Sequence, residues 1–127
     1  MFKDLIGIPF EFGKMDCEIL AKEVFSRYGI NLPDYGMARS AISKYIPEDI
    51  SKEMKKEFVN WVPIKEPEAP CLVALGRCDY INHVGVYIGD GKFIHTTITR
   101  GAVTIERLSN PLYRNRKLYR FNSNCSD

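Results

Sequence analysis

The chain has 127 residues, a length that fits a single domain with a core of its own. It is 45% hydrophobic and 27% charged, as in an ordinary globular protein rather than a disordered or fibrous one. A formal net charge of +2 is too small to indicate a nucleic-acid partner, because phosphate binding needs clustered Lys and Arg. No stretch is apolar enough for a signal peptide or a membrane span, so we expect a cytoplasmic chain as synthesised, without a membrane partner.

The first predicted element is a helix from Asp16 to Tyr28, over which apolar residues recur at helical spacing. Asp16 suits the N-cap position, because its carboxylate accepts hydrogen bonds from the unpaired amides of the first turn. Gly29 then ends the helix. The prediction therefore places Cys17 at the first helical position.

Further along the chain, two helices are predicted at Met37 to Tyr45 and Pro47 to Trp61, followed by an extended connection rich in proline. From Cys71 onward the pattern becomes that of strands, with β-branched and aromatic residues between turn signals. The predicted strands are Cys71 to Leu75, His83 to Ile88, Lys92 to Thr97, Val103 to Leu108 and Lys117 to Phe121. Helices followed by strands indicate an α+β domain.

The chain has only two histidines, His83 and His95, and both lie in the segment HVGVYIGDGKFIH. We expect a three-residue loop from Gly89 to Gly91, with Gly91 in the left-handed conformation. In that register Gly85 faces His95, and both histidines lie on one face of the hairpin. Diagonal neighbours are about 7 to 8 Å apart, near enough for two imidazoles to form a hydrogen bond. A two-residue loop would instead place the histidines on opposite faces.

A cysteine at a helix start and two histidines on one face together indicate a nucleophilic site. The helix amides and dipole lower the pKa of a thiol. A neighbouring imidazole forms a thiolate-imidazolium pair with it, and a third group orients that imidazole. Cys17, His83 and His95 can fill these roles, although each alone is more often a structural residue. A catalytic zinc on the same residues is an alternative, but no fourth ligand is evident, and we expect no metal or other cofactor.

Several motifs in this chain resemble the NlpC-type family of cell-wall cysteine peptidases. They are, in the family's order, GIPFEFG at 7 to 13, the Asp16-Cys17 pair, GINLP at 29 to 33, HVGVYIGDGKFIH, and the strand at Val103 to Leu108. The resemblance implies a single domain over residues 1–127 with a papain-like α+β fold, in which N-terminal helices pack on an antiparallel sheet of about five strands. The segment at about 35–66 matches weakly and is interpreted as a variable helical insertion.

The resemblance also implies the chemistry. Cys17 would attack an amide carbonyl, with His83 as the base and His95 orienting it. The implied reaction is hydrolysis of the bond between γ-D-glutamate and a diamino acid in peptidoglycan stem peptides. The protein would then reach the cell wall by a route that does not use a signal peptide.

Two alternatives stay open. GINLPDYG and the NP-x-Y ending are similar to variants in phage tail and prophage proteins, which favours a virion-associated tail or wall-binding module with little turnover and with phage tail proteins as partners. The other alternative is a thiol acyltransferase or amidase acting on a different γ-glutamyl substrate.

The surroundings of Cys17 depart from the family pattern. Family members usually carry Tyr where Phe10 stands, and a Phe ring cannot donate a hydrogen bond to an oxyanion. Losing one such donor typically costs about a hundredfold or more in rate. Glu18 replaces a usual small residue, and its carboxylate would oppose thiolate formation if it pointed inward. The residues expected to bind the oxyanion or the substrate are the Cys17 backbone amide, Phe10, Phe12, Asp16, Glu18 and Tyr87.

Overall fold

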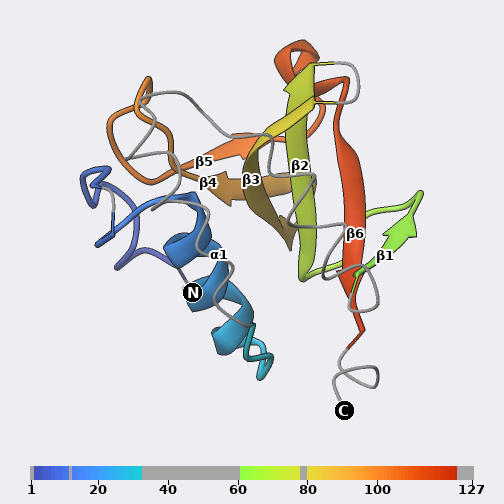
Figure 1. Ribbon diagram of the computed structural model, residues 1–127, viewed down its shortest axis with the longest axis horizontal. Helices are drawn as coiled ribbons and strands as arrows, with labels where there is room; N and C mark the ends of the chain where they lie inside the picture. The colour runs from blue at the N-terminus through green and yellow to red at the C-terminus, as the bar shows by residue number, and fades with distance from the viewer. Residues whose placement is uncertain (1, 12, 33–60, 78–79, 123–127) are drawn as a thin grey trace.

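The computed structural model describes residues 2–11, 13–32, 61–77 and 80–122, in which one α-helix packs against one antiparallel sheet (Figure 1). The strands run in the order β1-β6-β2-β3-β4-β5, so β6, the last strand in the chain, lies between β1 and β2. The elements are α1 (Cys17–Arg27), β1 (Trp61–Ile64), β2 (Cys71–Arg77), β3 (Tyr80–Gly89), β4 (Lys92–His95), β5 (Thr104–Arg107), the 3-10 helix η2 (Pro111–Tyr113) and β6 (Lys117–Phe121).

Helix α1 begins at Cys17, as the sequence predicts, because Asp16 caps it. One oxygen of the Asp16 carboxylate accepts from the Ile19 amide at 3.0 Å. The other accepts from the Gly13 amide at 2.8 Å, which fixes the loop that leads into the helix. The start of the helix is thus held by a single buried carboxylate.

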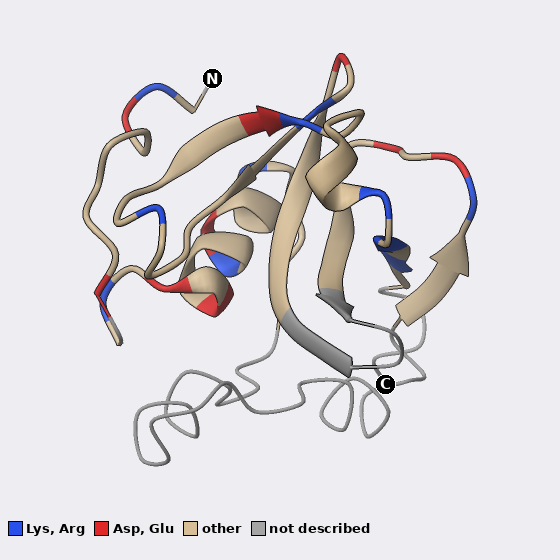
Figure 2. Ribbon diagram, turned by 90° about the horizontal axis from the view of Figure 1, so that it is seen from above, with Lys and Arg blue, Asp and Glu red and all other residues tan. Residues whose placement is uncertain are grey.

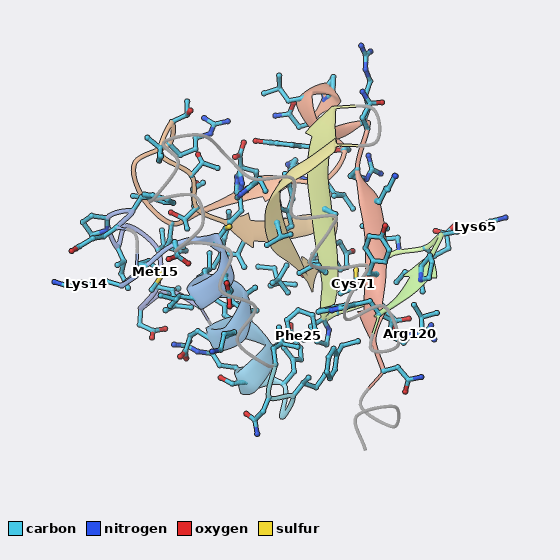
Figure 3. All side chains as sticks on the ribbon, in the orientation of Figure 1. Lys14, Met15, Phe25, Lys65, Cys71 and Arg120 are labelled. Carbon is cyan, nitrogen blue, oxygen red and sulfur yellow. The ribbon has the colours of Figure 1, made fainter. Side chains whose placement is uncertain are left out.

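The sheet is buried on both faces by two separate apolar clusters. On the face toward α1, helix residues such as Leu20 and Phe25 pack with strand residues such as Val86 and Ile94. Figure 3 shows Phe25 pointing from α1 toward the sheet. On the opposite face a smaller cluster gathers Cys71, Val73, Phe93, Leu108 and Leu118. The alternation of side chains along β3 and β4 therefore decides which residues face the helix and which face away.

All five predicted strands are present. β6 has the predicted limits, whereas the ends of the other four are shifted. The sheet has a sixth strand, β1, which the sequence did not predict. Trp61 belongs to this strand, so its assignment to a helix was wrong. It lies opposite Phe121 in the sheet, and its ring packs edge-on against Phe25 at 5.9 Å and Phe121 at 5.1 Å. These contacts are distant in sequence, and β1 is an edge strand that tolerates Pro63.

The predicted helices at 37–45 and 47–60, and most of the predicted insertion at 35–66, lie outside the described residues. Basic and acidic residues are interspersed over the described elements (Figure 2). In the portion of the chain that the structure describes, no helix has both the length and the apolar character needed to cross a membrane.

Candidate active site

The hairpin that carries both histidines has a two-residue turn at Asp90 and Gly91, which have φ of 54° and 72°. The predicted three-residue loop was therefore wrong. A bulge between Tyr87 and Gly89 absorbs the extra residue, so Gly89 pairs with Lys92 while Val86 pairs with Ile94. The bulge restores the predicted register, and the two histidines lie on one face of the sheet, away from α1.

Gly85 is needed for the position of His95. A Cβ atom at Gly85 would lie 2.9 Å from both His95 Cβ and the Ile94 carbonyl oxygen, and 3.0 Å from Phe93 Cδ2. Real Cβ atoms essentially never show separations as short as 2.9 Å, and 3.0 Å is tighter than most of their contacts. Gly85 therefore faces His95, as predicted, and its lack of a side chain leaves room for that residue.

The two imidazoles form a direct hydrogen bond. His83 Nε2 lies 2.9 Å from His95 Nδ1, and the ring centroids are 5.1 Å apart. His95 is buried, with a relative exposure of 2%, and its ring packs against Phe93 at 4.8 Å. His83 is only partly buried. The inner histidine is therefore held firmly and can orient the outer one.

A carboxylate that the sequence analysis missed lies beyond His95. Glu106 in β5 bonds to His95 Nε2 through Oε2, which also accepts from the Tyr113 hydroxyl at 2.7 Å. Arg100 donates to Glu106 Oε1 at 2.8 Å. Because Glu106 pairs with Phe93 across the sheet, it shares the face of His95. The polar alternation in the predicted strand at 103–108 was the signal that could have identified it.

Cys17 lies at the start of α1, partly buried against the helix-side core. The pKa of its thiol is raised to about 12, chiefly by burial and also by the negative charges of Asp16 and Glu18, while backbone hydrogen bonds from Val84 and Glu18 act in the opposite direction. The Glu18 amide at the helix start lowers this pKa, as predicted, but burial outweighs that effect and the net shift is upward. A helix terminus stabilises a charge by about 1 kcal/mol, less than one pKa unit, whereas burial shifts a pKa by several units.

The thiol meets the sheet where β4 stops. The pairing of β3 with β4 extends only to Val86 and Ile94, and the Cys17 sulfur lies at the Val84 amide, next to His83 in the chain. Among the hydrogen bonds of the described residues, none joins Cys17 Sγ to His83 or His95. The thiol thus approaches from the α1 side, while the histidines project from the other face.

Both histidines are neutral near neutral pH. Burial and the charge of His95 lower the pKa of His83 to about 3. Burial also lowers the pKa of His95, although its hydrogen bond to Glu106 opposes this shift. The site therefore combines a protonated thiol with neutral imidazoles, instead of the predicted thiolate-imidazolium pair. For a thiol in this state to act as a nucleophile, a general base must take up its proton during attack.

The remaining predicted site residues lie around this centre in varied roles. The Phe10 amide donates to the Gly101 carbonyl at 2.9 Å, which ties the N-terminal segment to the loop after β4. Glu18 is buried in the first turn of α1. The Tyr87 hydroxyl accepts from the Gly91 amide at 2.9 Å, at the tip of the hairpin. Asp16 is the helix cap, and Phe12 lies outside the described residues. Substrate binding by these residues stays a prediction.

No metal site is evident within the described ranges, where no three His, Cys, Asp or Glu side chains are grouped to hold an ion. Both ring nitrogens of His95 already have partners, His83 and Glu106. The zinc alternative would need at least one of these contacts to break.

Comparison with known proteins identifies a family but no individual relative. None of the curated proteins compared with the chain matches it significantly. The family model described as the NlpC/P60 family matches residues 7–121. This range contains Cys17, both histidines and Glu106, and it covers nearly the whole sequence. The chain therefore belongs to the NlpC/P60 family.

Proposed function

We propose that this protein is a cysteine peptidase or amidase that hydrolyses the bond between γ-D-glutamate and a diamino acid in peptidoglycan stem peptides. The family generally comprises cell-wall cysteine peptidases and amidases. The observation that carries the proposal is the 2.9 Å hydrogen bond between His83 and His95 beside the strand residue that the Cys17 sulfur contacts. A nucleophile, a base and an orienting group in this order are the minimum set for acyl transfer through a thioester.

The reaction begins with attack of Cys17 Sγ on the amide carbonyl carbon. The thiol proton passes to His83 Nδ1, because His83 Nε2 is engaged by His95. His83 then gives this proton to the leaving amine, the C–N bond breaks, and the acyl group stays on the sulfur as a thioester. A water molecule attacks the thioester, and His83 takes up its proton and returns one to the sulfur. The products are a free carboxylate and the regenerated thiol.

The proposed mechanism requires Cys17 and His83 to approach each other when the substrate binds. Hydrogen bonds between catalytic groups are often long or absent before the substrate arrives and tighten in the complex. The Cys17 amide is an oxyanion donor, because the Asp16 carboxylate engages the amide of Ile19 instead. Phe10 adds no second donor.

The test is release of new amino groups from purified muropeptides. The wild-type protein should release them, and Cys17→Ala should reduce kcat/KM by more than about 10³-fold. The matched control is Cys71→Ala, because Cys71 is a buried thiol on the face of the sheet away from α1 and its loss should leave turnover largely intact. If wild type and Cys17→Ala are equally inert on every muropeptide, the substrate assignment fails.

A second candidate function is a phage-tail or wall-binding module with little turnover. It is favoured by the raised pKa of Cys17 and by Phe10, which lacks the hydroxyl of the usual tyrosine. Such a module should sediment with purified cell-wall sacculi without releasing amines. The Cys17→Ala variant should bind the sacculi as well as the wild type does. Rapid release of amines by the wild type alone excludes this candidate.

Acyl transfer to an amine would use the same residues. Product analysis with and without an acceptor amine separates it from hydrolysis. An amide product that requires the acceptor identifies a transferase.

A further inference from the structure

Side chains from three different segments form hydrogen bonds with Glu106, which takes no part in the proposed reaction steps. His95 reaches it from β4, Arg100 from the loop after β4, and Tyr113 from η2. Its side chain has a relative exposure of 13%. By contrast, the ion pair between Arg120 and Glu68 lies at the surface, where the two side chains are 51% and 44% exposed. Glu106 is thus part of an ordered polar chain that leads from the loop surface to His83.

The charge state of Glu106 decides the direction of the hydrogen bonds in this chain. Burial raises its pKa, but the hydrogen bonds from Tyr113 and His95, together with the charges of His95 and Arg100, lower it below the ordinary value. The carboxylate is therefore ionised near neutral pH and can only accept hydrogen bonds. It follows that His95 carries its proton on Nε2 and donates it to Glu106.

The same logic continues to the outer histidine. A neutral imidazole with its proton on Nε2 has a bare Nδ1, so His95 Nδ1 accepts a hydrogen bond from His83 Nε2. The proton of His83 is thus fixed on Nε2, and its Nδ1 is left as a lone pair. That nitrogen is the base that a thiol proton requires.

We propose that Glu106 is a positioning residue that sets the tautomers of His95 and His83, and that Arg100 and Tyr113 hold its carboxylate in place. It acts on Cys17 only through the two imidazoles. It also stabilises the positive charge that arises on His83 when the thiol proton arrives. The effect of Glu106 on turnover rests on the proposed function, whereas the tautomer assignment does not.

The first experiment reads the tautomers directly by ¹⁵N NMR of the full chain labelled at histidine. The chain has only two histidines, so all four ring nitrogens can be assigned. In the wild type above neutral pH, both rings should show a proton on Nε2 and a bare Nδ1. A wild-type ring with its proton on Nδ1 overturns the proposal.

The informative variant is Glu106→Gln. Arg100 has only donors, so the amide oxygen of the new side chain must face it, and the amide NH₂ then faces His95 Nε2. His95 must move its proton to Nδ1, and His83 follows. Both rings should therefore change tautomer, and an unchanged spectrum overturns the proposal. The control is Glu68→Gln, which removes a carboxylate from an arginine pair outside the site and should leave the spectrum as in wild type.

The second readout is kinetic. With the base nitrogen blocked, Glu106→Gln should lower kcat/KM by about 10² to 10⁴-fold, mainly through kcat, as a wrong tautomer does in other triads. An active wild type with an equally active Glu106→Gln variant overturns the proposal. An inert wild type with the expected change of tautomers shows instead that the proposed function has failed while the positioning role stands.

Tyr113→Phe is the second variant if Glu106→Gln does not fold. It keeps the ring packed edge-on against Phe93 at 4.9 Å and removes only the hydroxyl, which donates to Glu106 Oε2 and accepts from Arg100 at 3.4 Å. The pKa of Glu106 should rise, so the pH at which the histidine tautomers change on acidification should rise too. An unchanged titration overturns the holding role of Tyr113.

Discussion

The two ends of the site are built in opposite ways. At the thiol end, Cys17 lies against an apolar core, with hydrogen bonds from backbone amides and two carboxylates nearby in the chain, and its pKa is raised to about 12. At the imidazole end, His95 is bonded through both ring nitrogens, and Glu106 behind it is bonded from three elements. The thiol end offers little to stabilise a negative charge, whereas the imidazole end is a complete polar network.

The difference indicates where the reactivity of the site originates. A helix start by itself does not make a reactive thiol when the sulfur is buried, because desolvation outweighs the dipole. The charges that arise when the Cys17 thiol loses its proton must therefore be stabilised by the base and by the substrate during proton transfer. The ordered network behind His83 is the part of the fold that can supply it.

Among substitutions that keep every polar side chain of the site, the largest effect is expected from Gly85→Ala, which displaces His95 at the imidazole end. The added Cβ overlaps His95 Cβ and the Ile94 carbonyl. Forcing β4 away should lower kcat/KM by about 10 to 10²-fold, because a displacement of about 1 Å costs that much in a positioned site. It should also lower the free energy of unfolding by about 1 to 3 kcal/mol. Muropeptide hydrolysis and urea denaturation measure the two effects.

Gly91→Ala is the control for this prediction. Gly91 has a φ of +72° and nothing within 4 Å of an added Cβ, so its substitution strains the hairpin turn without moving His95. It should lower stability by about 1 kcal/mol and leave kcat/KM nearly unchanged. Equal losses of activity in the two variants would show that hairpin stability, not the position of His95, sets the rate.

The pH dependence of stability should separate the two ends of the site. Unfolded histidine takes up a proton near its ordinary pKa of 6.5, whereas folded His83 does so only near 3. The free energy of unfolding should therefore fall as pH falls through this window. Unfolded cysteine loses its proton near its ordinary pKa of 9.0, whereas folded Cys17 keeps it to about 12, so stability should also fall as pH rises above 9.0.

Urea midpoints measured across the pH range test this prediction. His83→Gln should flatten the acid side of the curve only, and Cys17→Ala the alkaline side only. An alkaline side that is already flat in the wild type would contradict the raised pKa of the folded Cys17 thiol.

The sequence predicted the parts of the site that depend on local patterns. Asp16 before an apolar helical repeat was enough to place Cys17 at the helix start. The spacing within one hairpin placed both histidines on one face, even though the turn itself differs from the prediction. Both inferences need only backbone periodicity over a short stretch of chain.

What the sequence did not predict depends on contacts between distant segments. Trp61 joins a strand because of Phe25 and Phe121, and Glu106 reaches His95 because β5 pairs with β4. The pKa of Cys17 is set by burial at the end of β4, which no local pattern contains. The family match places the chain in the NlpC/P60 family, but it does not reveal how this chain balances the charges of Cys17, His83 and His95.

The smallest effect is expected at Thr96, which follows His95 at the end of β4. It is completely buried, and its hydroxyl has no hydrogen-bond partner among the described residues. Thr96→Val keeps the shape of the side chain and removes an uncompensated polar group, so it should raise the free energy of unfolding by up to about 1 kcal/mol. The matched control is Thr97→Val, which removes the acceptor of the Arg100 amide at 3.0 Å and should lower stability by about 1 kcal/mol. Urea denaturation measures both effects. If Thr96→Val is more stable but loses hydrolysis, the buried hydroxyl serves the reaction rather than the fold.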